Sequence, residues 1–504
     1  MPRVLSKVLV ANRGEIAVRV IATCRAMGIA TVAVYSDADR DALHVRLADE
    51  AVHVGPPPAR ESYLDVPRIL AAARETGADA IHPGYGFLSE NAGFARAVEA
   101  AGLAWIGPPP AAIEAMGSKI EARKTMEAAG VPVVPGVHDA GQDRAALVAA
   151  AHRIGFPVLV KAAAGGGGKG MKTVMAPDEL EGALESAERE ALAAFKDGSI
   201  YLEKLLVRPR HVEIQIFGDR HGQVIHLGER ECSIQRRHQK VVEESPSPAL
   251  TPALRAAMGH AAVLAGKAVG YVGAGTVELM LGEDGGYYFL EMNTRLQVEH
   301  PVTEAVYGVD LVRAQLLVAM GKSLDDIGLV AAAAAPRGHA IEVRLYAEDP
   351  GNGFLPATGT LQRWRLPPMP GVRLDTGYAE GDPVSVHYDP MLAKLIAWGD
   401  DREHARRRLF AALRAWEIHG VVTNLDFLAD VIAHPAYAEG ATHTGFIAER
   451  WPDGWSRPEV GDDHQILAAV ARALGAGPTG AAAVGGEPAA TPSPWTSLGP
   501  WRSA

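Results

Sequence analysis

Apolar and amphipathic segments alternate along the first hundred or so residues. Apolar strands are expected over residues 7–12 and 30–35, with an amphipathic helix over 15–27 between them. Two further apolar segments, 78–83 and 103–107, continue the series. Strands separated by helices in this way predict a parallel sheet.

A second pattern, two strand-like segments with a short turn, lies in the middle of the chain. Residues 275–281 and 286–290 are apolar, and the glycine-rich segment 282–286 joins them. If Asp284 and Gly285 are the central turn residues, Glu278 pairs directly with Glu291, with β-carbons about 5 Å apart. A divalent cation such as Mg²⁺ or Mn²⁺ would remove the repulsion. The alternative places each glutamate in solvent.

Polar side chains crowd the segment that follows this strand pair, residues 290–301. Apolar strands rarely end in such dense charge unless a metal, a phosphate or a substrate lies there. The dense charge of this segment therefore favours a metal ion bound by Glu278 and Glu291 over two solvent-exposed glutamates. Its polar residues include Glu291, Asn293, Arg295, Gln297 and Glu299.

A glycine run follows another apolar strand, residues 156–161, which ends in Lys161. Consecutive glycines let backbone N–H groups turn toward an anion, and the adjacent Lys169 adds positive charge. A flexible linker is the alternative. The strand and the two lysines favour phosphate binding by this loop.

Two polar stretches lie between these motifs. Residues 210–216 alternate polar and apolar side chains, which places His211 and Glu213 on one face of a half-buried strand. Residues 229–244 are almost wholly polar and are bracketed by apolar segments. Such a run is usually a solvated face, but this bracketing favours the rim of a site.

Composition narrows the class of protein. The length of 504 residues suits about three domains, and 48% hydrophobic residues suffice for sizeable cores. A net charge of −11 argues against nucleic-acid binding. No apolar stretch reaches membrane-spanning length, and two cysteines suit a reducing, cytoplasmic location. Cys232 is expected to be a packing residue and not a nucleophile.

Domain boundaries follow from composition shifts. The predicted fold class is α/β (α+β). It comprises a parallel-sheet domain over 1–118, a domain over 119–330 that carries a mobile lid at about 134–206, and a smaller strand-rich domain over 336–449. Residues 450–504 are expected to be a linker or tail that begins a docking region, and residues 475–494 within it are rich in Ala, Gly, Pro and Thr.

In combination, these motifs resemble biotin carboxylases of the ATP-grasp superfamily, from about residue 4 to about residue 449. The motifs that carry the resemblance stand in family order at residues 11–17, 82–90, 161–171, 203–204, 210–213, 231–240 and 291–299. The resemblance implies an ATP-grasp fold for the middle domain. It also implies that ATP, Mg²⁺ (or Mn²⁺), bicarbonate and biotin bind to the protein.

The resemblance also implies roles for individual residues. The residues expected to bind ATP are Lys119, Lys161, Gly165, Gly166, Gly167, Gly168, Lys169, Met171, Glu203, Lys204, Leu206, His211, Gln235 and His238. The residues expected to bind the metal are Glu278, Glu291 and Asn293. The residues expected to bind bicarbonate are Lys240, Arg295, Gln297 and Val298. Those expected to bind biotin are Tyr85, Phe87 and Arg344.

The implied reaction is ATP- and bicarbonate-dependent carboxylation of biotin through carboxyphosphate. Glu299 would deprotonate bicarbonate, with Lys240 and Arg295 beside it, and Arg344 would stabilise the biotin enolate. Arg344 alternates with Glu342 in a strand-like segment. The alternative for Arg344 is therefore an ion pair with Glu342 or Glu348.

The tail is similar to the segment that follows the carboxylase region in acyl-CoA carboxylase α chains of the methylcrotonyl and geranyl type. A docking region and a biotin carboxyl carrier domain would follow, but no Ala-Met-Lys-Met attachment motif is present. The chain is expected to be a fragment or to use a separate carrier. The implied partners are the carrier domain, a carboxyltransferase subunit and a second copy of the chain, in a homodimer or a larger α/β complex. Nucleic acid and membrane are not expected as partners. The alternatives are another ATP-grasp ligase and a nucleotide-binding scaffold without catalysis.

Overall fold

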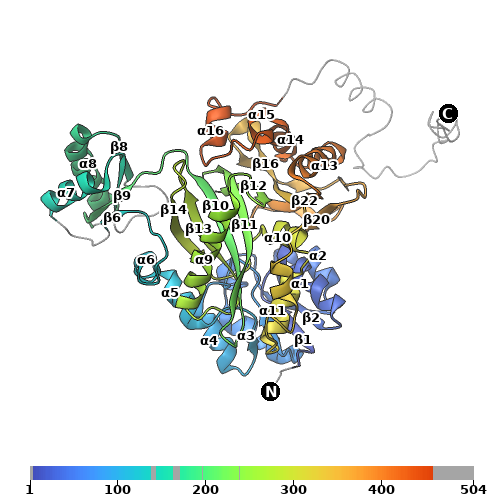
Figure 1. Ribbon diagram of the computed structural model, residues 1–504. Coiled ribbons are helices and arrows are strands. Elements are labelled where there is room, and N and C mark those ends of the chain that lie inside the picture. The colour runs from blue at the N-terminus through green and yellow to red at the C-terminus, as the bar shows by residue number, and fades with distance from the viewer. Residues whose placement is uncertain (1–3, 138–142, 163–170, 196, 238, 458–504) are drawn as a thin grey trace, which may run out of the picture. The chain divides into compact units, whose positions relative to one another are not determined.

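The computed structural model of the chain is shown in Figure 1. It describes residues 4–137, 143–162, 171–195, 197–237 and 239–457. Residues Met1–Ser456 form one compact unit, and Arg457–Ala504 form a second, which lies almost wholly outside the described ranges. Within these ranges, no helix has the length and apolar character needed to cross a membrane.

The N-terminal part contains a five-stranded sheet in the order β3-β2-β1-β4-β5, and all of its strands are parallel. Val8 and Val10 pack toward α1, and Leu9 packs toward α3 and α4, so helices cover both faces. The predicted parallel sheet is confirmed. The strands are β1 Lys7–Val10, β2 Ala30–Ser36, β3 Glu50–Gly55, β4 Ala80–His82 and β5 Ala104–Trp105, and the helices are α1 Gly14–Ala26, α2 Leu43–Leu47, α3 Val66–Thr76, α4 Ala92–Ala100 and α5 Pro110–Gly117.

The middle and C-terminal parts share one eight-stranded antiparallel sheet, in the order β14-β13-β10-β11-β12-β15-β22-β20 (Figure 1). The strands are β10 Arg210–Gly218, β11 Val224–Arg236, β12 Gln239–Ser245, β13 Gly273–Leu281, β14 Tyr287–Asn293, β15 His339–Tyr346, β20 Val372–Thr376 and β22 Met391–Gly399. Because β12 pairs with β15, this sheet contains strands from both sides of the boundary predicted near residue 330.

The two faces of this sheet differ in polarity. Ile214, Leu279, Val343 and Leu395 lie on an apolar face, covered by α9 and α13. Their neighbours along each strand point to the opposite face and are buried polar residues, among them Glu213, Glu278, Arg344 and Lys394. Helix α10 packs against this polar face. The helices around the sheet are α6 Lys119–Ala128, α9 Pro252–Ala268, α10 His300–Tyr307, α11 Leu311–Ala319, α12 Leu329–Ala333 and α13 Arg402–Ala415.

A separate four-stranded sheet, in the order β6-β9-β7-β8, lies within the predicted lid. Its core contains Val158, Val160 and Leu202 together with Leu184 from α8. The elements are β6 Gly136–Val137, β7 Val158–Ala162, β8 Met171–Val174, β9 Ile200–Lys204, α7 Arg144–Ile154 and α8 Leu180–Phe195. The glycine run between β7 and β8 lies outside the described residues.

The remaining elements belong to the C-terminal part. Trp451 and Trp455 pack on its core, so the packed chain continues past the predicted end at residue 449. The elements are β16 Glu348–Asp349, β17 Leu355–Pro356, β18 Gly359–Thr360, β19 Arg363–Arg365, β21 Pro383–Val384, β23 Glu417–His419, α14 Leu425–Ala433, α15 Pro435–Ala438 and α16 Phe446–Arg450.

Candidate active site

The β13–β14 hairpin brings Glu278 opposite Glu291, as predicted. The predicted turn is wrong, however. Gly282 N–H donates to Gly286 O at 2.7 Å, so the loop has three residues instead of two. With that loop alone, Glu278 would face Leu290. A β-bulge at Leu290 restores the glutamate pair.

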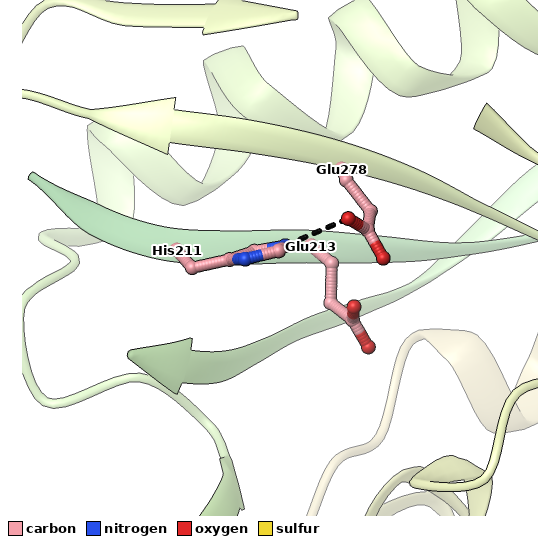
Figure 2. Close-up of side chains that lie close together, drawn as sticks. All are labelled: His211, Glu213 and Glu278. Carbon is pink, nitrogen blue, oxygen red and sulfur yellow. Dashed lines mark ion pairs between the residues drawn. The ribbon is translucent and has the colours of Figure 1, made fainter. Parts of the chain in front are cut away.

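Glu278 lies within a close group of buried acids and His211 (Figure 2). One ligand atom each from His211, Glu213 and Glu278 lies within 4.8 Å of the others, a spacing that suits a metal ion. His211 Nε2 lies 3.0 Å from Glu278 Oε2. Lys240 Nζ, however, contacts both carboxylates, so an ammonium already compensates their charge. Glu213 and Glu278 of this trio therefore bind the Lys240 ammonium in place of a metal ion.

Lys240 is the central cation of the site. Its Nζ donates to Glu213 Oε2 at 2.5 Å, Glu278 Oε1 at 2.8 Å and Glu299 Oε1 at 2.7 Å. Burial disfavours the charged ammonium, but these carboxylates outweigh burial and raise the pKa of Lys240 well above its ordinary value. Lys240 is therefore charged and fixed.

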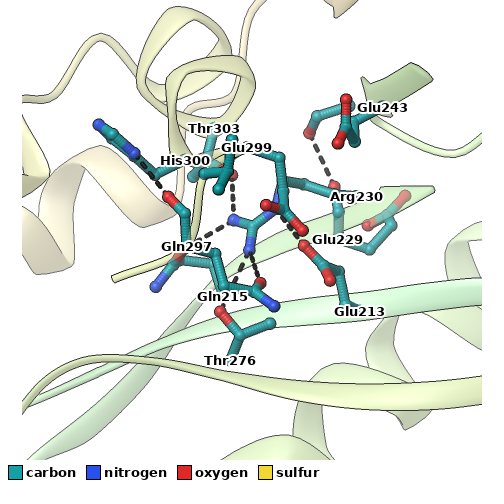
Figure 3. Close-up of polar contacts among 12 residues, drawn as sticks. Glu213, Gln215, Glu229, Arg230, Glu243, Thr276, Gln297, Glu299, His300 and Thr303 are labelled. Carbon is teal, nitrogen blue, oxygen red and sulfur yellow. Dashed lines mark hydrogen bonds and ion pairs between the residues drawn. The ribbon is translucent and has the colours of Figure 1, made fainter. Parts of the chain in front are cut away.

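The Arg230 side chain holds the polar groups that surround Lys240 in place (Figure 3). Arg230 was not among the site residues predicted from the sequence. The side chain is fully buried, and it donates to Glu213 Oε1 at 2.5 Å and to Gln297 Oε1 at 2.8 Å. Gln215, Thr276 and Thr303 accept its remaining donated hydrogen bonds. The Gln297 amide is thereby oriented, and its Nε2 donates to Glu278 Oε1 at 2.8 Å.

Glu299, the predicted base, lies between two cations at the start of α10. Its Oε1 accepts from Lys240, and its Oε2 accepts from Arg344 Nη2 at 3.0 Å. Burial opposes ionisation, but Lys240, Arg344 and Arg230 hold the pKa of Glu299 below its ordinary value. The carboxylate is therefore ionised and able to accept a proton.

Arg344 reaches this point from β15, and its partners differ from those considered in the sequence. Nε donates to Glu243 Oε1 at 2.6 Å, and Nη2 donates to Glu299. Glu348 pairs with Arg236 at 3.2 Å, and Glu342 makes no ion pair among the described residues. The alternative that Arg344 serves Glu342 or Glu348 is wrong.

Asn293 and Arg295 continue the site from the end of β14. Asn293 Nδ2 donates to Glu278 Oε1 at 2.8 Å, and its Oδ1 accepts from Arg295 Nη2 at 3.0 Å. Glu90 also accepts from Arg295 Nε, at 3.0 Å, and from Thr294 N–H. The Glu90 carboxylate therefore links the parallel-sheet part to this segment.

The Glu278–Glu291 pair fits a divalent cation. Burial and the neighbouring Glu278 raise the pKa of Glu291, and its nearest cation, Lys119 Nζ, lies 3.9 Å away. Lys240 Nζ compensates Glu278 at 2.8 Å but leaves the Glu291 carboxylate open to a cation, and paired carboxylates form a donor set that suits Mg²⁺. A hollow of about 240 Å³ beside the pair is lined by residues that include Glu90, Lys119, Leu290, Glu291 and Asn293. A larger hollow of about 450 Å³, between Arg208 and His443, contains none of the predicted site residues.

Residues of the lid that are predicted to bind the nucleotide also lie close together. Lys161 on β7 and Arg123 on α6 both form ion pairs with the Glu203 carboxylate on β9, and Arg123 was missed in the sequence. The Lys204 ammonium instead donates to the backbone oxygens of Gly155 and Phe156, each at 2.9 Å.

The other predicted residues are placed as follows. Gln235 Nε2 lies 2.7 Å from His211 Nδ1, and Val298 O accepts from Lys394 Nζ at 2.7 Å. Phe87 stacks on Tyr63 with ring centroids 5.1 Å apart, and the Tyr85 hydroxyl is buried without a hydrogen-bond partner among the described residues. Leu206 follows β9, and Met171 begins β8. Gly165, Gly166, Gly167, Gly168, Lys169 and His238 lie outside the described residues.

The polar run 229–244 is not a rim, which corrects the prediction. Its residues form most of β11 and β12, central strands of the sheet, and Arg230, Glu231 and Glu243 are buried. Within this run, burial raises the pKa of the Cys232 thiol well above its ordinary value, which fits a packing residue.

Comparison with known proteins adds independent evidence. Residues 4–113 match the family model of the biotin carboxylase N-terminal domain, and 342–449 match that of the biotin carboxylase C-terminal domain. Between them, residues 118–327 match the ATP-binding domain of the carbamoyl-phosphate synthase L chain.

Individual relatives agree with the family models. The mitochondrial methylcrotonoyl-CoA carboxylase subunit alpha of Oryza sativa subsp. japonica is 55% identical over 445 residues, 88% of this chain, but the chain spans only 60% of that relative. Biotin carboxylase of Halalkalibacterium halodurans is 52% identical over 88% of this chain and 97% of its own length.

A solved structure shares the fold as well. The biotin carboxylase domain dimer of Hydrogenobacter thermophilus 2-oxoglutarate carboxylase, in complex with MgADP, ADP and bicarbonate, is 44% identical. It superposes with a TM-score of 0.80 over 91% of this chain and 100% of that one. With this fold, these family models and these relatives, the chain belongs to the biotin carboxylase family of ATP-dependent, ATP-grasp ligases.

Proposed function

We propose that the protein carboxylates biotin on a carrier domain, with ATP and bicarbonate as the other substrates. The observation that carries the proposal is the ionised Glu299 carboxylate, held by Lys240 on one oxygen and by Arg344 on the other. This arrangement combines a base, a cation for an anionic substrate and a cation for a developing oxyanion.

The nucleotide would lie along the hollow beside Glu291. Lys119 and Lys161 would contact its phosphates, and Glu203 would lie near the adenine. Glu278 and Glu291, with Asn293 nearby, would hold Mg²⁺, which when bound neutralises charge on the phosphate oxygens. The Lys161–Glu203 ion pair would then be exchanged for contacts with the nucleotide.

Bicarbonate would lie beside Arg295, Gln297, Val298 and Lys240. Glu299 would remove its proton, and the cationic side chains of Lys240 and Arg295 would stabilise the dianion that results. The dianion attacks the γ-phosphoryl group of ATP, and ADP leaves. The carboxyphosphate produced decomposes to CO₂ and phosphate.

Biotin would be bound next to Arg344, near Tyr85 and Phe87. Phosphate accepts the N1′ proton, and the enolate that forms attacks CO₂. Arg344 Nη2, which here donates to Glu299, would donate to the enolate oxygen. Glu243 holds Nε of the guanidinium, so only the Nη2 contact changes in this step.

The relatives suggest partners. The rice relative is named as an alpha subunit of methylcrotonoyl-CoA carboxylase, and the Hydrogenobacter structure is a dimer. On this basis we propose a homodimer that works with a biotin carboxyl carrier domain and a carboxyltransferase subunit. Two buried free thiols, Cys24 and Cys232, support a cytoplasmic location.

ATP hydrolysis tests the proposal. We expect Mg²⁺-dependent hydrolysis that requires bicarbonate and rises with free biotin. Equal rates in bicarbonate-depleted and bicarbonate-rich buffer would contradict the bicarbonate assignment. Tight ATP binding without hydrolysis would instead support a nucleotide-binding scaffold.

A further inference from the structure

Two buried glutamates lie directly opposite each other behind the site. Glu243 on β12 and Glu342 on β15 are Cα partners, and both are 0% exposed. Residues paired in this way have β-carbons about 5 Å apart. Two negative charges at such a distance in a dry interior repel strongly.

Most of the oxygens of this pair have no partner. Glu243 Oε1 accepts from Arg344 Nε at 2.6 Å. Glu243 Oε2 and both oxygens of Glu342 have no hydrogen-bond partner among the described residues. An unpaired buried carboxylate costs many kcal/mol, whereas a carboxylic acid is neutral and gains an O–H donor.

Among the described residues, no cation forms an ion pair with Glu342. Arg344 on β15 is divided between Glu243 and Glu299, and Lys240 on β12 reaches Glu213, Glu278 and Glu299. Lys394 on β22 donates to Val298 O and lies 3.4 Å from Glu15. His300 on α10 contributes no positive charge, because burial and nearby cations hold its pKa well below its ordinary value.

The titration behaviour agrees with this geometry. Burial raises the pKa of Glu342 well above its ordinary value; Lys394 and Arg344 oppose the shift, whereas Glu243 and Glu299 add to it. Burial likewise raises the pKa of Glu243 to about 7, although Arg344 opposes the shift. When two such groups interact, the protons belong to the pair.

We propose that Glu243 and Glu342 share one proton and that the singly protonated pair positions Arg344 for biotin carboxylation. Glu342, as the neutral acid, donates its O–H to the free Oε2 of Glu243. Glu243 remains a carboxylate and holds Arg344 Nε, so that Nη2 faces Glu299 and the reacting groups. Both glutamates are positioning residues, and the inference rests on the proposed role of Arg344.

Loss of the shared proton has a direct consequence. A second negative charge beside Arg344 draws the guanidinium toward the pair and away from Glu299 and biotin. Biotin carboxylation should therefore decline at alkaline pH as the pair ionises. ATP cleavage in bicarbonate without biotin should decline far less, because Lys240 still holds Glu299 and the Arg344 oxyanion contact is not used.

The pH profile of Glu342→Gln tests the pair. Glutamine retains an N–H donor for Glu243 but does not titrate. The alkaline decline of biotin carboxylation should move upward by at least about one pH unit, a tenfold change in proton affinity. The matched control is Glu15→Gln. Glu15 is a buried acid whose carboxylate oxygens have no hydrogen-bond partner among the described residues, and its Oε2 lies 3.4 Å from Lys394 Nζ. This control should keep the wild-type decline, and an unchanged decline in Glu342→Gln would overturn the proposal.

Glu243→Gln tests the link to Arg344. It should lower biotin carboxylation about tenfold or more while biotin-independent ATP cleavage changes little, a split that a general folding defect does not produce. A parallel fall of both rates, with ATP affinity, would overturn the positioning role.

Infrared spectroscopy tests the proton without any activity. Wild type at neutral pH should show a carboxylic-acid C=O band that disappears on alkaline titration and is reduced in Glu342→Gln. Absence of a titrating band in wild type would overturn the shared proton. If wild type lacks bicarbonate-dependent ATP cleavage, the proposed function fails, and the infrared result still decides the pair.

Discussion

At the scale of single residues, the site consists of cations held by buried carboxylates. Lys240 has three carboxylate partners, and Arg344 has two. Buried charges of this kind are retained only when they are paired and hydrogen-bonded. Glu291 differs, because its nearest cation is 3.9 Å away. It is therefore the residue whose charge the metal-free protein needs least.

Glu291→Gln should separate activity from stability. Removing this carboxylate weakens the metal site, so ATP turnover should fall by at least about tenfold. The substitution also removes a repulsion with Glu278, so the Tm without nucleotide should hold or rise. The control is Glu283→Gln in the turn of the same hairpin, where the side chain is 70% exposed. It should change neither quantity. A large fall in Tm with activity retained would mean that Glu291 is structural.

The sequence predicts the residue types of the site better than their partners. Strand alternation indicated that His211 and Glu213 share a face and that Arg344 shares one with Glu342. The partner of Arg344, Glu243, lies 101 residues away in sequence. Only the β12–β15 pairing brings the two together, and no local pattern shows it. Arg230 was missed for the same reason, because its acceptors lie on several elements.

At the scale of elements, the β13–β14 hairpin determines the geometry of the metal pair. The predicted two-residue turn and the observed three-residue loop differ by one position, and the bulge at Leu290 cancels the difference. The prediction of opposed glutamates was therefore right although its turn was wrong. The loop depends on Gly285, whose φ is 81°.

Gly285→Ala should destabilise the protein by about 1 kcal/mol, because a Cβ disfavours this left-handed conformation. Urea unfolding measures the change. Gly117→Ala is the control, since open space surrounds this position at the end of α5 and its φ is not positive. It should change stability by less than about 0.5 kcal/mol. Equal effects at both sites would contradict the role of the turn.

At the scale of the whole molecule, one sheet carries groups from the middle and C-terminal parts to a common polar face. Strands β12 and β15 pair across the boundary predicted near residue 330, because composition marks a linker but not the pairing of the strands it joins. The parallel sheet, in contrast, follows from local alternation and was predicted correctly. Buried ionisable groups on these sheets and helices make stability depend on pH.

Glu15 illustrates this dependence. Burial raises its pKa to about 7, although Lys394 opposes the shift. The folded protein thus retains a proton that the unfolded chain releases near pH 4.3, so the stability gained from this group at acid pH is lost as pH rises to about 7. Buried His44 and His82 act in the opposite direction, because burial lowers the pKa of each to about 4.

Glu15→Gln should therefore gain stability relative to wild type as pH rises. The difference in unfolding free energy should grow from little near pH 4 to about 3 kcal/mol at pH 7. Urea unfolding at several pH values measures it. Glu283→Gln, with its exposed carboxyl, should show no such trend. A difference that is independent of pH would contradict a protonated Glu15.

Transfer of labelled carbon from bicarbonate to biotin tests the central claim most directly. Wild type and Arg344→Ala are incubated with labelled bicarbonate, MgATP and free biotin, and both carboxybiotin and ADP are measured. Wild type should label biotin only when ATP is present. Arg344→Ala should label it a few hundred-fold more slowly, as expected for a lost oxyanion donor, while ATP cleavage without biotin falls far less. ATP consumption by wild type without label on biotin, or equal losses of both rates in Arg344→Ala, would contradict the account.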